Sequence, residues 1–135
     1  MKKVTLIALA LLLQQALLYT QWQQIATIGN NDLRAVKFFN EFTGIVVVQG
    51  GIWRSTNAGV NWTPVQNGVN LNSISFPDIN NGYAVGDSGK IFKSTDNGQT
   101  WYSQISYVQF DLYSVSFINN NTGHAVGNNG IILRT

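Results

Sequence analysis

Three copies of one pattern follow each other along the chain, and this repetition restricts the fold more than any other feature. Each copy opens with a short segment of mixed apolar and polar residues that begins with leucine and ends in phenylalanine, and Phe38, Phe76 and Phe117 lie 38 and then 41 residues apart. A glycine-led apolar run follows each phenylalanine after a short turn-forming stretch. Four short strand candidates in about 40 residues are typical of a β-propeller blade, a sheet of four antiparallel strands. The repeat therefore predicts an all-β propeller.

The second copy shows the four strand candidates most clearly. They are Leu71–Phe76, Tyr83–Val85, Ile91–Ser94 and Trp101–Ile105, separated by Gly, Asn and Asp. A sandwich also has many short strands, but it would not repeat their sequence in this register. The composition agrees, because only 10% of the residues are charged while 44% are hydrophobic, and turn formers are plentiful. Such a mixture favours strands and turns over helices.

The repeats extend over nearly all of the chain after its first twenty residues. We predict a partial propeller over residues 21–135, with repeat units over about 32–69, 70–110 and 111–135. Gln21–Ile25 resembles Trp101–Ile105, so residues 21–28 are expected to form a lone fourth strand that closes a ring. These units make about two and three-quarter blades, whereas propellers close with about 4–8. The sequence is therefore expected to be the N-terminal fragment of a ring of about six to eight blades.

The first twenty residues have the pattern of a secretory signal peptide. A basic start, Met1-Lys2-Lys3, precedes a ten-residue run from Val4 to Leu13 that is apolar except for Thr5. Two glutamines then interrupt the run, which is too short to span a bilayer. We predict an isolated signal helix over residues 1–20, cleavage near residue 20, and a secreted or periplasmic protein. An uncleaved leader acting as a membrane anchor is the alternative.

Charge and cysteine content exclude several classes of function. The formal charge of +2 includes Lys2 and Lys3 of the leader, so the mature chain is neutral. Its remaining basic residues are scattered singly, which argues against nucleic-acid binding by a basic face. The chain has no cysteine, which excludes disulfides, thiol nucleophiles and cysteine-ligated metals.

One turn occurs twice with the same spacing of its residues. The copies place a serine, an Asp or Asn, a glycine and a tryptophan at matching positions: Ser55, Asn57, Gly59 and Trp62, then Ser94, Asp96, Gly98 and Trp101. A short carboxylate or amide oxygen can accept hydrogen bonds from the N–H groups just ahead of it, and glycine tolerates a positive φ. The tryptophan supplies a large apolar surface that fastens the returning strand. We therefore interpret these eight residues as structural.

These residues carry a family resemblance. Ser94-x-Asp96-x-Gly98-x-x-Trp101 resembles the Asp-box, or BNR repeat, of sialidase-like propellers, and the first copy differs from it only at Asn57. The longer stretch from Phe76 to Ser94 is similar to the photosystem II assembly and stability factor family. That resemblance implies a seven-bladed propeller in which the box is a turn between the third and fourth strands, away from any active site.

Comparison of the copies with each other argues against catalysis in this stretch. Each aspartate aligns with an asparagine in another copy: Asp32 and Asp111 with Asn70, Asp78 with Asn40 and Asn119, Asp87 with Asn128, and Asp96 with Asn57. Because asparagine is the other good turn former, these carboxylates are expected to hold turns. Glu41 has no predicted carboxylate partner, and the lone His124 aligns with strand residues. We predict no catalytic, cofactor-binding or metal-binding residue.

Residues that differ between the copies are better candidates for binding. On the presumed innermost strands, Arg34 aligns with Asn72 and Tyr113, and Lys37 aligns with serines. Polar residues near the mouth of a propeller channel can contact a partner. The leading hypothesis is a secreted, non-enzymatic scaffold that binds another protein or a glycan. The alternative is the N-terminal part of a sialidase- or xyloglucanase-like glycoside hydrolase whose catalytic residues lie beyond Thr135.

Overall fold

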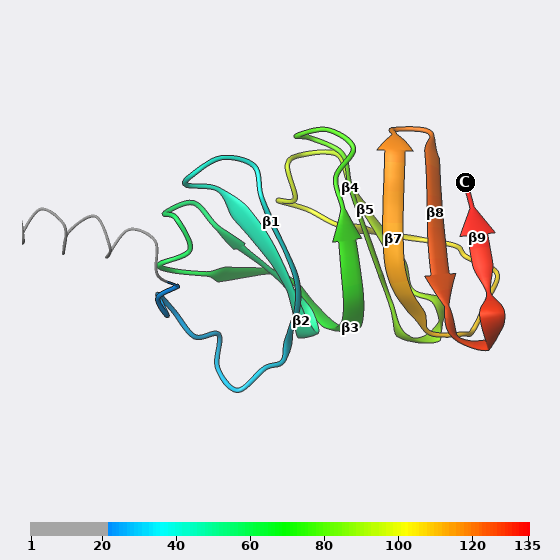
Figure 1. Cartoon of the computed structure of the whole chain (residues 1–135), viewed down its shortest axis with the longest axis horizontal. Helices are drawn as coiled ribbons and strands as arrows, with labels where there is room; N and C mark the ends of the chain where they lie inside the picture. Colours follow the sequence, from blue (N-terminus) through cyan, green and yellow to red (C-terminus); the bar gives the residue numbers. More distant parts are fainter. Residues whose placement is uncertain (1–21) are drawn as a thin grey trace, which may run out of the picture.

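The computed structural model describes residues 22–135, and the predicted signal helix lies outside these residues. Their strands pair only in antiparallel fashion and form three blades that stand side by side (Figure 1). This confirms the prediction of an all-β fold made of propeller blades. The strands are β1 Leu33–Phe38, β2 Gly44–Ser55, β3 Thr63–Ser75, β4 Gly82–Gly86, β5 Ile91–Ser94, β6 Tyr102–Gln104, β7 Leu112–Asn119, β8 Thr122–Gly127 and β9 Ile132–Arg134.

Two long strands connect the first two blades. The first half of β2 pairs with β1, and its second half pairs with the first half of β3. The second half of β3 then pairs with β4, which continues to β5 and β6. Blade 1 therefore consists of β1, β2 and the first half of β3, and blade 2 consists of the rest of β3 with β4 to β6. Blade 3 consists of β7, β8 and β9.

The fusion of two expected strands into β2 has a local cause. In blades 2 and 3 a 3-10 turn separates the second and third strands, η1 Asp87–Gly89 and η2 Asn128–Gly130. The corresponding link in blade 1 is one residue shorter, so the backbone bends through a bulge at Gly50–Gly51 instead. Gly50 has a φ of 102°, a conformation that glycine adopts without strain. The strand consequently continues across the bend.

Residues 22–28 form no strand in this structure, and the lone closing strand over residues 21–28 stays a prediction, because the blade with which it would close a ring is not among the described residues. A strand needs a neighbouring edge to satisfy its backbone hydrogen bonds, and no strand among the described residues pairs with this segment. The segment instead packs on blade 1, where Ile28 is buried with Val46 and Val48. Trp22 remains fully exposed.

The hydrophobic core lies between the blades. Strand β4 is buried along its whole length, and its side chains alternate between two neighbours, as the pleat of a strand requires. Ala84 packs in the cluster that contains Ile45 and Val47 of blade 1. Tyr83 and Val85 pack in the cluster that contains blade 3 residues. Because each face of blade 2 is covered by a neighbouring blade, the apolar runs are buried by stacking of blades.

The repeated phenylalanines pack against the repeated glycines that follow them. The Phe76 ring lies so close to Gly82 that a Cβ there would be 2.3 Å from the ring. Phe76 also meets Trp101 edge to face, with ring centroids 5.9 Å apart. Phe38 contacts Gly44 and Trp62 in the same way, and Phe117 contacts Gly123. The phenylalanine thus connects the first strand of a blade to the tryptophan of its Asp-box.

Candidate binding surface on the inner strands

The Asp-box of blade 2 is a closed network of hydrogen bonds. Ser94 donates its hydroxyl to the Asp96 carboxylate at 2.8 Å and accepts the N–H of Gly98 at 3.0 Å. The carboxylate also accepts the N–H of Gln99 at 3.0 Å, and the N–H and hydroxyl of Thr100 at 2.9 and 2.6 Å. Asp96 therefore satisfies groups of its own turn, with no oxygen directed to another element.

The blade 1 copy makes nearly the same network with an amide. Ser55 donates its hydroxyl to the Asn57 side-chain oxygen at 3.0 Å and accepts the N–H of Gly59 at 3.0 Å. The same amide oxygen accepts the N–H of Asn61 at 2.9 Å. Each box tryptophan donates its indole N–H to the carbonyl of the box glycine, at 2.8 Å for Trp62 and 3.1 Å in blade 2. An amide can thus do the work of the carboxylate in this turn.

Hydrogen bonds also lower the pKa values of two aspartates. Partial burial raises the pKa of Asp96, but the bonds from Thr100, Ser94 and Gln99 together outweigh burial and hold the pKa below its ordinary value. The backbone N–H and then the side-chain amide of Asn81 are the main causes that hold the pKa of Asp78 at about 2. Both groups are carboxylates at neutral pH, so neither can serve there as a general acid.

The other aspartates on turns also bond to the fold. The Asp111 carboxylate accepts the N–H of Ser88 at 2.8 Å, which joins the start of blade 3 to blade 2. Asp78 accepts two backbone N–H groups of its turn, at 2.7 Å each. The asparagines aligned with it, Asn40 and Asn119, also accept backbone N–H groups with their side-chain oxygens. Asparagine and aspartate therefore serve the same purpose at this position.

The first strands of the three blades are neighbours. β1, the second half of β3, and β7 succeed each other across the molecule (Figure 1). The N–H groups of Val115 and Phe117 on β7 donate to the hydroxyls of Ser73 and Ser75 on β3, at 3.3 and 3.1 Å. Strands so close across a blade boundary occupy the inner edge of the ring, where blades converge. The predicted surface residues lie on these strands.

The structure brings two of the four candidate residues into direct contact. Arg34 of blade 1 donates to the side-chain oxygen of Asn72 in blade 2 at 3.0 Å. The Asn72 amide donates in turn to the carbonyl of Leu112 at 2.9 Å and to the Asp87 carboxylate at 3.1 Å. A polar relay therefore runs across all three blades, and it fixes the position of the Arg34 guanidinium group.

The other two candidates are accessible on the same strands. Lys37 is exposed on β1, and Tyr113 on β7 has an exposed fraction of 55%. The relay and these side chains together form what we call the inner-strand surface: Arg34, Lys37, Asn72 and Tyr113. It offers a partner two cations and a phenol, while the partly buried Asn72 amide is occupied in the relay; such a surface suits a partner with an anionic group.

Sequence reasoning missed a contact between blades. Arg54 of blade 1 donates to the carbonyl of Asn97 in blade 2 at 3.3 Å and to its side-chain oxygen at 2.8 Å. The basic residue repeated at this position, Lys93 in blade 2, was a signal for it. His124 and Glu41 are exposed. In residues 22–135, no three His, Cys, Asp or Glu side chains gather as a metal site, and no helix is long and apolar enough to cross a membrane.

Several solved structures resemble this chain. YCF48 bound to D1 peptide matches with a TM-score of 0.72 and 23% identity, over 87% of this chain and 40% of that one. YCF48 from Cyanidioschyzon merolae has a TM-score of 0.70 and 20% identity, over 84% and 37%. An ancestral GH74 enzyme has a TM-score of 0.70 and 24% identity, over 84% and 18%. These likenesses establish the fold, and the chain spans less than half the length of each.

Comparison by sequence identifies the family. No curated protein matches the chain. The family model for photosynthesis system II assembly factor YCF48 matches residues 63–135, which is more than half of the chain. The matched region begins with the fourth strand of blade 1 and includes blades 2 and 3. The chain therefore belongs to the photosynthesis system II assembly factor YCF48 family.

Proposed function

We propose that this chain is part of a non-enzymatic propeller scaffold, and that its inner-strand surface binds a segment of a partner protein. The observation that carries the proposal is the exposure of Arg34, Lys37 and Tyr113 on the inner strands, together with the bond by which the partly buried Asn72 holds Arg34. These positions differ between the copies of the repeat, so the repeated architecture does not account for their identities.

The relay preorganises the Arg34 side chain for binding. Its bond to Asn72 holds the long side chain across the boundary between blades 1 and 2, so part of its conformational entropy is already lost before binding. Lys37 follows three residues later on the same strand. A peptide carboxylate placed between them would gain two charge-assisted interactions. The Asp78 and Asp96 carboxylates remain occupied by groups of their own turns.

The comparisons support a protein partner for the family. One similar structure is of YCF48 bound to D1 peptide, so that protein binds a peptide. By family membership we extend peptide binding to this chain, and the D1 peptide is the first probe to use. A secreted or periplasmic location is a further part of the proposal, and it depends on the leader at residues 1–20. Sequencing of the N-terminus after export would test it.

Binding of the D1 peptide should be measured by biolayer interferometry with the protein in its full reading frame. The double variant Arg34→Ala/Lys37→Ala is expected to weaken binding roughly tenfold or more, because charge-assisted hydrogen bonds contribute about 1.5–3 kcal/mol each. Lys90→Ala is the matched control, since Lys90 is exposed but lies outside the inner strands. Equal affinities of the double variant and the control would reject the inner-strand surface as the binding site.

The glycoside hydrolase alternative keeps one supporting observation, the likeness to an ancestral GH74 enzyme. That likeness extends to 18% of the enzyme chain, and any acid pair would have to come from outside the described residues. Hydrolysis of a xyloglucan oligosaccharide or of a fluorogenic sialoside by the protein in its full reading frame would decide for this alternative. Peptide binding without hydrolysis would decide for the scaffold.

A further inference from the structure

Bulges in the first strands place Arg34 and Asn72 at the boundary between blades 1 and 2. In the pairing of β3 with β4 the register shifts between Leu71 and Ser73, so Asn72 is the extra residue of a bulge. Arg34 is the extra residue of the corresponding bulge in β1. A bulge redirects the side chain of its extra residue relative to the regular pleat. The two side chains meet across the boundary, with 3.0 Å between the Arg34 Nη1 and Asn72 Oδ1 atoms.

The Asn72 side-chain amide uses both of its ends. Its oxygen accepts a hydrogen bond from Arg34, whereas its nitrogen donates to the Asp87 carboxylate at 3.1 Å and to the Leu112 carbonyl at 2.9 Å. A guanidinium group only donates, and a carboxylate and a carbonyl only accept. Rotation of the amide by half a turn would therefore set donor against donor, or oxygen against oxygen, at all three contacts. The three partners select one orientation of the amide.

The Asp87 side chain serves this relay and not its own turn. The carboxylates of Asp78 and Asp96 bond to groups of their own turns, whereas the Asp87 carboxylate accepts from a residue of another strand, β3. The Asn72 amide has the Arg34 cation at its oxygen and the Asp87 anion at its nitrogen. Its dipole therefore lies in the favourable direction with respect to both charges.

The turn that carries Asp87 is itself held in place. The N–H of the next residue, Ser88, donates to the Asp111 carboxylate at 2.8 Å. The preceding residue, Gly86, lies so close to β3 that a Cβ would be 2.0 Å from the Asn70 carbonyl oxygen. The Asp87 acceptor is therefore fixed relative to both β3 and the start of blade 3.

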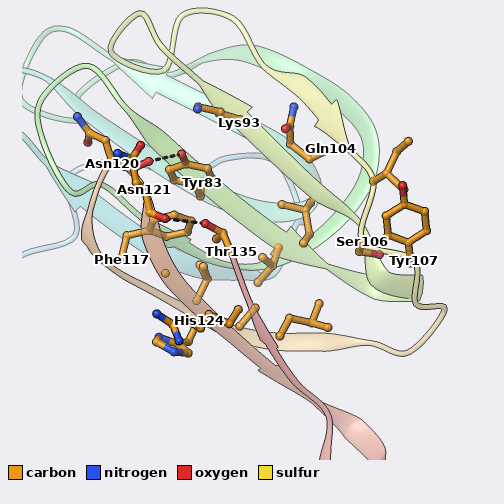
Figure 2. Close-up of a pocket in the computed structure, with 18 residues that line it drawn as sticks. Tyr83, Lys93, Gln104, Ser106, Tyr107, Phe117, Asn120, Asn121, His124 and Thr135 are labelled. Atoms are coloured by element: carbon orange, nitrogen blue, oxygen red, sulfur yellow. Dashed lines mark hydrogen bonds between the residues drawn. The ribbon is translucent and has the colours of Figure 1, made fainter.

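The Leu112 carbonyl, the second acceptor, belongs to a strand that is held firmly against blade 2. The Tyr83 ring of blade 2 stacks on Phe117 with centroids 3.6 Å apart, and its hydroxyl donates to the Asn120 carbonyl at 3.1 Å (Figure 2). Two N–H groups of β7 also donate to serine hydroxyls of β3, and the Leu112 side chain is fully buried. Both acceptors of the Asn72 amide are thus on fixed elements.

Blade 3 shows that the pair formed by Asn72 and Asp87 is not part of the repeated architecture. Tyr113 occupies the position of Asn72 there, and Asn128 occupies that of Asp87. The side-chain oxygen of Asn128 is buried and has no hydrogen-bond partner among residues 22–135. The bond between Asn72 and Asp87 lies within one blade, so its counterpart in blade 3 would need no further blade. The propeller blade can therefore form without this bond.

We propose that Asp87 is a positioning residue for the inner-strand surface. By holding the nitrogen of the Asn72 amide, it keeps the amide oxygen toward Arg34 and fixes the guanidinium group in the orientation that receives the anionic group of a partner. This inference rests on the proposed function of that surface. It adds that an anionic residue strengthens the binding of an anionic group, because it restricts the cation that makes the contact.

Nuclear spin relaxation of the Arg34 side chain, measured by ¹⁵N NMR on the full chain without peptide, tests the positioning directly. We expect a high order parameter for the Nε–H bond of Arg34. Asp87→Ala should lower it to below about 0.6, the range of a flexible group. Asp87→Asn should give an intermediate value, because an amide oxygen can still accept from Asn72 but lacks the charge. Asp32→Ala is the matched control, since the exposed Asp32 lies two residues before Arg34 and outside the relay.

The affinity for the D1 peptide, measured by biolayer interferometry, gives the second readout, and the sign of the effect separates positioning from charge. Asp87→Ala should weaken binding about two- to tenfold, which is the cost of ordering one long side chain on binding. Loss of a negative charge alone would instead leave the binding of an anionic group unchanged or strengthen it, and this is the result expected for Asp32→Ala. In the Arg34→Ala background, Asp87→Ala should cause no further loss, since both changes act through one contact.

Three outcomes would overturn the proposal. These are an Arg34 order parameter that Asp87→Ala leaves unchanged, tighter peptide binding by Asp87→Ala, and an effect of Asp87→Ala on affinity that persists without the Arg34 side chain. If the unchanged chain bound no peptide, the proposed binding surface would be rejected, while the relaxation measurement would still decide whether Asp87 positions Arg34. Circular dichroism verifies folding, and if Asp87→Ala does not fold, an order parameter of Asp87→Asn equal to that of the unchanged chain would refute the role of the charge.

Discussion

Substitution of Asp96 gives the sharpest test of its structural role, because blade 1 already contains the conservative variant. Asp96→Asn keeps one side-chain oxygen for the N–H groups of the turn, as Asn57 does, and loses the charge on the 2.6 Å bond from Thr100. Asp96→Ala removes every acceptor and leaves the hydroxyl of Ser94, which is fully buried, without this partner. The two changes should therefore differ strongly in cost.

The magnitudes follow from the hydrogen bonds lost. A bond to a charged group contributes about 1.5–3 kcal/mol, and an ordinary bond contributes about 0.5–1.5 kcal/mol. We expect Asp96→Asn to lower the free energy of unfolding by about 1 kcal/mol or less. We expect Asp96→Ala to lower it by about 2–3 kcal/mol, which exceeds the range of about 0.5–2 kcal/mol for a lost cap contact because several bonds to a charged group are lost together. Urea unfolding monitored by circular dichroism at pH 7 measures both.

The pH dependence gives a second readout of the same site. The pKa of Asp96 is lower in the folded chain than its ordinary value of 3.8. Its ionised form therefore stabilises the fold above about pH 4, and this contribution is lost as the pH falls through the folded pKa. The difference in stability between the wild-type chain and Asp96→Asn should accordingly shrink between about pH 4 and lower values. If Asp96→Asn were as costly as Asp96→Ala, the reasoning from Asn57 would be refuted.

Three further predictions concern the packing and the turns. Gly82→Ala should destabilise the chain by more than about 2 kcal/mol in urea unfolding, because its Cβ would be 2.3 Å from the Phe76 ring; a neutral result would contradict this packing. Tyr83→Phe keeps the stack of the ring on Phe117 and loses only the 3.1 Å bond from the hydroxyl to the Asn120 carbonyl. Thermal melts should therefore show a loss of stability of about 1 kcal/mol or less for this variant. The loss for Tyr83→Ala should be about 3–5 kcal/mol. NMR titration of the Asp78 carboxyl should give a pKa of about 2, and a value near 3.8 would argue against its hydrogen bonds.

Much of the fold could be predicted because the same sequence pattern occurs three times along the chain. The strand predicted over Tyr83–Val85, from the glycine-led apolar run that each copy repeats, lies within β4. The exchange of Asp96 for Asn57 indicated that a side-chain oxygen holds the turn, and in both boxes that oxygen accepts a backbone N–H group. Both inferences rest on contacts within one blade, which lie close in sequence.

Sequence patterns did not predict contacts that cross between blades, or features that depend on the exact number of residues in a link between two strands. The bond from Arg54 to Asn97 joins positions 43 residues apart, and no local pattern specifies it. The link at Gly50 is one residue short, which turned two expected strands into one. Residues 22–28 resemble a fourth strand in sequence, yet no strand edge among the described residues pairs with them, so the closing strand stays a prediction. The role of Arg34, Lys37, Asn72 and Tyr113 as a binding surface stays a prediction, although the relay joins two of them.

The continuous strand β3 has a consequence for how the molecule responds to force and to partial unfolding. Its first half is the outer strand of blade 1, and its second half is the inner strand of blade 2. Blades 1 and 2 should therefore exchange their amide hydrogens as one cooperative unit. Blade 3 joins through residues 105–111, which form no strand, and should open separately. A force applied at the outer edge of blade 1 would be transmitted along the backbone of β3 to the inner edge of blade 2.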